Sequence, residues 1–196
     1  MKNELSDWEK LLEAQRSIYQ DQPVNTFVPR AATQAIKKES GVVYKNDITY
    51  ADDYPNSTFD ILYSDDQYSS RPTWIHIHGG GFLFGPVQGA CYRHTDRTSL
   101  IDAIAEKGYN VVAVRYALSP DYKFPTPIIQ MNQVIAYLKE NAAGLKLDMR
   151  EVVIGGDSAG AILAAQYACL ATPPSSPGCL WHCAVDKRKR AEGSDA

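Results

Sequence analysis

The stretch from Glu151 to Gly160, EVVIGGDSAG, constrains the fold more than any other part of the chain. Its β-branched run at residues 152–154 predicts a buried strand, and the apolar residues 159–170 predict a helix. Ser158 therefore lies on the turn between a strand and a helix. A G-x-S-x-G turn has glycines where the strand and helix backbones approach closely, and it holds the serine in a strained conformation at a helix N-terminus. That position favours a developing negative charge, so Ser158 is the candidate nucleophile.

A second glycine-rich turn precedes this one in the chain. Residues 73–77, TWIHI, predict an apolar strand, and His78 and three glycines follow it directly. Glycines have no side chains in the way, so their backbone N–H groups are able to turn toward an oxyanion. The predicted oxyanion-hole donors are the N–H groups of Gly79, Gly80, Gly81 and Ala159.

These two motifs resemble those of a known family. HGGGF at residues 78–82 and GDSAG at residues 156–160 are similar to the motifs of hormone-sensitive-lipase-like esterases, which are α/β-hydrolases. Residues 115–120, RYALSP, resemble that family's YRLAP-type segment, and the similarity covers roughly residues 42–171. The resemblance implies an α/β-hydrolase core with a mostly parallel sheet, and a serine carboxylesterase that needs no cofactor and acts on small-molecule acyl esters.

The resemblance also implies roles for the neighbours of the motifs. Along a hydrolase chain the order is serine, acid, histidine, so His78 is expected to orient the glycine loop and not to act as the general base. Asp157 is expected to be structural, because the family does not use the position before the nucleophile as the triad acid. His76 is expected to be a packed or surface histidine.

The other elements alternate between strands and helices, as in an open α/β sheet. Ser6 and Glu9 form a capping-box pattern at the start of an N-terminal helix, and the resemblance makes residues 1–40 a helical cap-like segment. Periodicity predicts further strands at residues 42–50, 58–63 and 111–114, and further helices at residues 100–108 and 125–138.

The resemblance ends after Ala171. Residues 172–196 contain no predicted strand or helix and are expected to be a disordered or out-of-family tail. Residues 1–171 are thus expected to be the N-terminal part of a hydrolase domain that is incomplete in its C-terminal half. The triad acid and base stay unassigned, because the candidates, Asp186 and His182, follow Ser158 in the wrong order. Activity is expected to be impaired.

The composition of the chain limits the classes of partner that we expect it to bind. There are 20 Lys and Arg against 23 Asp and Glu, a net charge of −3, which gives no reason to expect nucleic acid or an anionic membrane as a partner. The sequence has no apolar run long enough for a membrane span or a signal peptide, so a cytoplasmic location with reduced cysteines is expected. The spacing of Cys179, His182 and Cys183 matches no zinc pattern, and no metal is expected.

Two other functions stay open: a small-molecule-binding protein on the same fold, and a nonfunctional fragment. The acyl length and the alcohol group of a substrate are not fixed by the sequence. Oligomerisation is also open, because residues 152–154 would form an exposed apolar edge without further strands beside them.

Overall fold

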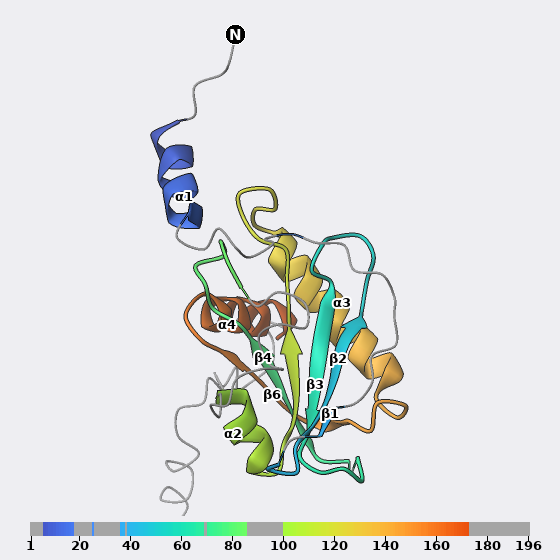
Figure 1. Ribbon diagram of the computed structural model, residues 1–196. Helices are drawn as coiled ribbons and strands as arrows, with labels where there is room; N and C mark the ends of the chain where they lie inside the picture. Colours follow the sequence, from blue (N-terminus) through green and yellow to red (C-terminus); the bar gives the residue numbers. More distant parts are fainter. Residues whose placement is uncertain are drawn as a thin grey trace, which may run out of the picture.

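A six-stranded sheet forms the centre of the protein, with the strands in the order β1-β2-β3-β5-β4-β6 (Figure 1). The computed structural model describes residues 6–17, 25, 36–37, 39–68, 70–85 and 100–172. The strands are β1 (Ile36–Lys37), β2 (Val43–Thr49), β3 (Thr58–Tyr63), β4 (Pro72–Ile77), β5 (Asn110–Val114) and β6 (Asp148–Gly156). The helices are α1 (Asp7–Ser17), α2 (Leu100–Glu106), α3 (Thr126–Asn141) and α4 (Ala159–Ala171).

The predicted strands and helices are confirmed, with ends within a few residues of those expected. At the start of α1 the capping box is formed, because the Ser6 N–H donates to the Glu9 carboxylate at 2.9 Å and the Glu9 N–H donates to Ser6 Oγ at 3.3 Å. The predicted cap-like segment is otherwise largely outside the described residues. The predicted tail is outside them from residue 173 onward, and with it His182 and Asp186.

The sheet is mixed. β1, β2, β3 and β5 pair antiparallel in turn, whereas β4 pairs parallel with both β5 and β6. The α/β class is therefore confirmed, but the described sheet is mixed and not mostly parallel as expected: the parallel pairing is confined to β5, β4 and β6, and the other pairs are antiparallel. Parallel strands end at the same edge of a sheet, so the segments that follow these three strands meet there.

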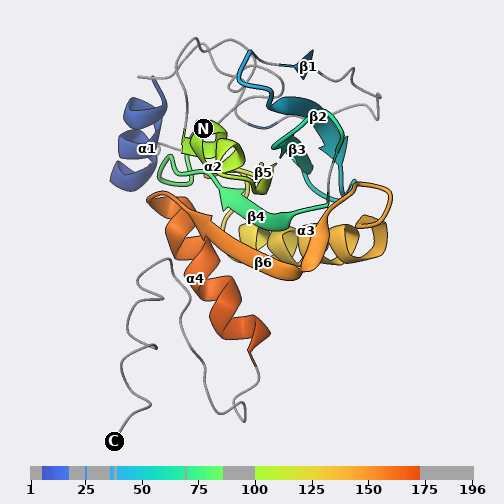
Figure 2. The ribbon, with the colours of Figure 1, turned by 90° about the horizontal axis from the view of Figure 1, so that it is seen from below.

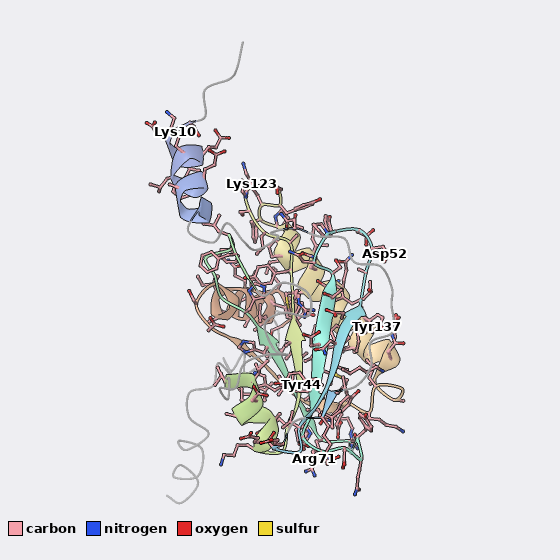
Figure 3. The ribbon with its side chains drawn as sticks, viewed as in Figure 1. Lys10, Tyr44, Asp52, Arg71, Lys123 and Tyr137 are labelled. Atoms are coloured by element: carbon pink, nitrogen blue, oxygen red, sulfur yellow. The ribbon has the colours of Figure 1, made fainter. Side chains whose placement is uncertain are left out.

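Helices cover both faces of the sheet (Figure 2). On β5, Val112 and Val114 pack in the core shared with α3 and α4, while Val111 and Ala113 pack in the core shared with α2. This alternation follows from the two-residue period of a strand. Tyr44 belongs to the α2 core, and its hydroxyl donates to Asp102 of α2. Tyr137 of α3 packs edge-on against Phe59 in the other core (both tyrosines are labelled in Figure 3).

β6 is the last strand of the described sheet, and β4 is its one partner there. The predicted apolar edge at residues 152–154 is half-buried. The helix that follows, α4, is apolar nearly all round, and Ile162 and Leu170 are 52% and 70% exposed. No helix in the described ranges is long and apolar enough to cross a membrane.

A buried cation joins the antiparallel part of the sheet to the end of β5. Arg115 is 2% exposed, and its guanidinium donates to Thr58 Oγ1 at 3.0 Å and to Asp60 Oδ2 at 2.5 Å. Asp47 Oδ1 lies 3.5 Å from the same guanidinium. Burial raises the pKa of Asp60, and the neighbouring Arg115 opposes that rise. Arg115 thus neutralises carboxylates that burial would otherwise make costly.

We expect Arg115→Met to lower the free energy of unfolding by about 3–5 kcal/mol, because it leaves the carboxylates of Asp60 and Asp47 buried without a cation. Urea unfolding at neutral pH measures this. The matched control is Arg150→Met, which removes an exposed arginine paired with Asp148 and should change stability little. Equal losses in the two variants would contradict this account of Arg115.

Candidate active site

The carboxyl ends of β4, β5 and β6 lie side by side. In the ladder Ile77 pairs with Val114 on one side and with Gly156 on the other. The three segments that begin after these residues contain the two predicted motifs and residues 115–120. The fold therefore brings the two predicted motifs and residues 115–120 together at one edge of the sheet.

Ser158 lies on a sharp turn between β6 and α4. Its φ of 48° and ψ of −116° are strained for a residue with a side chain. Two positions of the turn lie so close to the end of β4 that they have no room for a side chain. A Cβ on Gly156 would lie 2.2 Å from the carbonyl oxygen of Ile77, and a Cβ on Gly160 would lie 2.0 Å from the same oxygen. Ser158 is exposed and directly precedes the first residue of α4, Ala159.

The glycine loop after β4 is tied to this turn by Asp157. The Gly79 N–H donates to Asp157 Oδ1 at 3.1 Å. A Cβ on Gly79 would lie 2.3 Å from Asp157 Oδ2, so a side chain at position 79 would displace the carboxylate from this orientation. Gly80 and Gly81 have φ of 105° and 60°, which bends the loop back on itself. The Gly80 carbonyl accepts from the N–H groups of Leu83 and Phe84 at 3.0 and 3.2 Å and closes the bend.

His78 is held inside the loop. Its ring stacks on Tyr116, with centroids 4.3 Å apart and planes 7° apart, and the Tyr116 hydroxyl donates to the His78 carbonyl at 2.9 Å. Nδ1 lies 2.6 Å from the Gly79 carbonyl oxygen, which only accepts, so Nδ1 carries the proton. Burial lowers the pKa of His78 to about 4, and the ring is neutral near pH 7.

Two residues that support this region were missed from the sequence. A Cβ on Gly85 would lie 2.1 Å from His78 Cε1, so this glycine makes room for the ring. Asn25 donates to the Leu118 carbonyl at 3.0 Å and accepts from the Leu118 N–H at 2.8 Å, which fixes the segment after β5. Gly85 continues the glycine-rich pattern and was detectable in principle, whereas nothing in the sequence connects Asn25 with a residue 93 positions away.

One of the predicted oxyanion donors already has a hydrogen-bond acceptor in this structure. The Gly79 N–H is used by Asp157, whereas the N–H groups of Gly80 and Gly81 donate to no acceptor within the described ranges. No described side chain hydrogen-bonds to the Ser158 hydroxyl, and His182 and Asp186 lie outside those residues. Nor do the described residues contain a group of three or more His, Cys, Asp or Glu that could hold a metal ion.

The chain is similar in sequence to a known family and to several known proteins. The model of the BD-FAE family matches residues 59–175, more than half of the chain. The acetyl esterase of Salmonella typhi is 34% identical over 103 residues, which are 53% of this chain and 30% of the esterase. The putative alpha/beta hydrolase R526 of Acanthamoeba polyphaga mimivirus is 28% identical over 106 residues, 54% of this chain and 29% of that protein. The chain thus spans about 30% of the length of these curated relatives.

Solved structures match over a larger share of the chain. An inhibited esterase B from Lactobacillus rhamnosis superposes with a TM-score of 0.58 and 24% identity, over 85% of this chain and 48% of the esterase. MGS-M1, an alpha/beta hydrolase from a deep-sea metagenome library, superposes with a TM-score of 0.52 and 27% identity, over 70% of this chain and 54% of that one. The described part of the chain therefore has the architecture of about half of such a protein.

We expect Gly160→Ala to lower the free energy of unfolding by about 3 kcal/mol or more, because the new methyl group would overlap the backbone carbonyl of Ile77. Thermal unfolding measures the loss. Gly144→Ala is the control, since its Cβ would meet nothing closer than 3.6 Å and its φ is not positive. A Gly160→Ala variant as stable as Gly144→Ala would contradict the close contact between β4 and the serine turn.

The buried neutral His78 predicts a dependence of stability on pH. Its pKa is about 4 in the folded protein and about 6.5 when unfolded. Between these values the unfolded chain binds a proton that the folded chain does not, so stability falls as the pH is lowered from 6.5 to 4. The loss should reach about 3 kcal/mol below pH 4. Urea unfolding at several pH values in this range measures the free energy of unfolding. The native chain should lose this stability as the pH falls, whereas His78→Gln should not. Equal pH dependence in the two proteins would contradict this role of His78.

Proposed function

Because the chain belongs to the BD-FAE family and has the α/β-hydrolase fold, we propose that it carries the nucleophile and the oxyanion hole of a carboxylesterase that acts on small acyl esters. One observation carries the proposal: Ser158 lies exposed on a strained turn, and Asp157 beside it is bonded to the glycine loop that follows β4. The names of two similar proteins, acetyl esterase and esterase B, agree with this activity.

The chemistry would run as acyl transfer. Ser158 Oγ would attack the ester carbonyl, form a bond to its carbon and lose its proton to a base. The base would return that proton to the ester oxygen as the C–O bond breaks, so that the alcohol leaves and the acyl-enzyme forms. Negative charge develops on the former carbonyl oxygen. The Ala159 N–H at the start of α4 and the N–H groups of Gly80 and Gly81 are the proposed donors to that oxygen. Gly79 supports them, because its own N–H is bonded to Asp157.

Neither of the two described histidines is a good candidate for the proton acceptor. His76 and His78 are both 6% exposed, and His78 donates its Nδ1 proton within the glycine loop. We therefore propose that the base and the acid come from outside the described residues, with His182 and Asp186 as the candidates in this chain. Their order departs from that of the family, so the activity of this chain is proposed to be weak. An oxyanion hole and binding alone leave about 10³–10⁴-fold acceleration over water.

We expect slow uptake of one phosphonyl group per chain when the protein is incubated with a fluorophosphonate, measured by intact-mass spectrometry. The adduct should be lost in Ser158→Ala, because this reagent requires an activated serine. Ser119→Ala, which removes a hydroxyl near the end of the neighbouring segment, is the control and should label like the native chain. A folded protein that forms no adduct would contradict an activated Ser158 and would favour a binding protein or an inactive fragment.

A further inference from the structure

A second histidine reaches the active site from within the sheet. His76 belongs to β4 and is 6% exposed, and its Nε2 lies 3.5 Å from Asp157 Oδ1. The same carboxylate oxygen accepts the Gly79 N–H at 3.1 Å. One oxygen atom of Asp157 thus stands between a buried ring of the sheet and the backbone of the glycine loop.

The surroundings of the His76 ring indicate which of its nitrogens carries the proton. His76 Nδ1 is buried and has no hydrogen-bond partner among the described residues. A carboxylate only accepts hydrogen bonds, so Nε2, which faces it at 3.5 Å, is the nitrogen placed to carry the proton. A neutral ring with its proton on Nε2 satisfies Asp157 and leaves no buried donor unpaired at Nδ1. Burial lowers the pKa of His76, which agrees with a neutral ring.

The register of the sheet makes this contact possible. His76 pairs with Gly155 on β6, and side chains two residues apart share a face of a strand, so His76 lies on the same face as position 157. Gly155 has no side chain between them. A Cβ there would lie 3.0 Å from the Trp74 ring, which belongs to the same face. The glycine before the GDSAG motif therefore leaves this face open for a ring and a carboxylate to meet.

We propose that His76 is a positioning residue for the oxyanion hole: its Nε2–H holds the Asp157 carboxylate against the Gly79 N–H. The Asp157 side chain is 59% exposed, so with the Gly79 N–H as its one partner it would readily exchange that bond for water. The donor from the sheet restricts the carboxylate to one orientation. The Gly79 peptide is then fixed, and with it the direction of the N–H groups of Gly80 and Gly81. This catalytic consequence rests on the function proposed above.

The test compares two replacements of His76 in the full chain. Gln keeps an N–H donor but has a different shape, whereas Phe keeps a ring of similar size but has no donor. Hydrogen exchange of the Gly79 amide, followed by NMR, reports the bond to Asp157 directly. We expect His76→Phe to speed this exchange by roughly tenfold, as expected for one net hydrogen bond, and His76→Gln to stay close to the native rate.

The matched control is Thr73→Val, which removes a side-chain hydrogen bond of β4, the one from Thr73 Oγ1 to the Asp148 carbonyl. It should leave the exchange of Gly79 unchanged. If His76 only packs the sheet, the order of the two variants reverses, because Phe fills the space better than Gln. A Phe variant with native protection of Gly79, or a Gln variant as fast as Phe, would overturn the proposal.

The proposal can also be tested on the native chain, without any variant that could fail to fold. The ¹⁵N shifts of the His76 ring at neutral pH should report a neutral ring with the proton on Nε2, and a proton on Nδ1 would overturn the proposal. The rate of phosphonylation of Ser158 then tests the catalytic consequence, and it should fall in His76→Phe and recover in His76→Gln. A native chain that is not phosphonylated would refute the proposed function, while exchange and ring shifts would still decide the role of His76.

Discussion

The contact on which the site depends is the approach of the last carbonyl group of β4 to the serine turn. The Ile77 oxygen occupies the space that a side chain at position 156 or at position 160 would fill. Because the turn can come this close, the glycine loop that continues from β4 begins directly beside it. The strained backbone of Ser158 lies between Gly156 and Gly160 in the sequence, and close contacts of this kind let a conformation that costs energy persist in a folded protein.

The loop is then held from two directions, and the two supports differ in character. On the β5 side the support is mostly apolar and neutral: the Tyr116 ring stacks on His78, whose pKa of about 4 keeps it uncharged. On the β6 side the support is a carboxylate bonded to the Gly79 N–H. An aromatic stack fixes the plane of the histidine, and a hydrogen bond fixes the direction of one peptide. Together they restrict the glycines, whose conformational freedom would otherwise leave the proposed oxyanion donors poorly aligned.

Much of this could be predicted from the sequence, for reasons that are local. The run at residues 152–154, the capping box at Ser6 and the breaks at glycine each act within a few residues, and the elements they predict are present. The resemblance to hormone-sensitive-lipase-like esterases is confirmed by the match to the BD-FAE family and by an acetyl esterase relative. The order of the sheet was not predictable in this way. β5 lies between β3 and β4, and this pairing depends on contacts between residues some 50 positions apart.

The same limit explains what was missed in the site. The sequence predicts that His76 is packed or at the surface, and it is packed. Its contact with Asp157 joins residues 81 positions apart and depends on the register between β4 and β6. That register matters because β6 has β4 as its one partner in the described sheet. With pairing on one side only, the position of the serine turn relative to the glycine loop is set by the β4 ladder, the Ile77 contact and the Asp157 bond. Each of the three joins β4 or its loop to β6 or its turn, so a change in any one of them moves Ser158, the proposed nucleophile, relative to the proposed oxyanion hole.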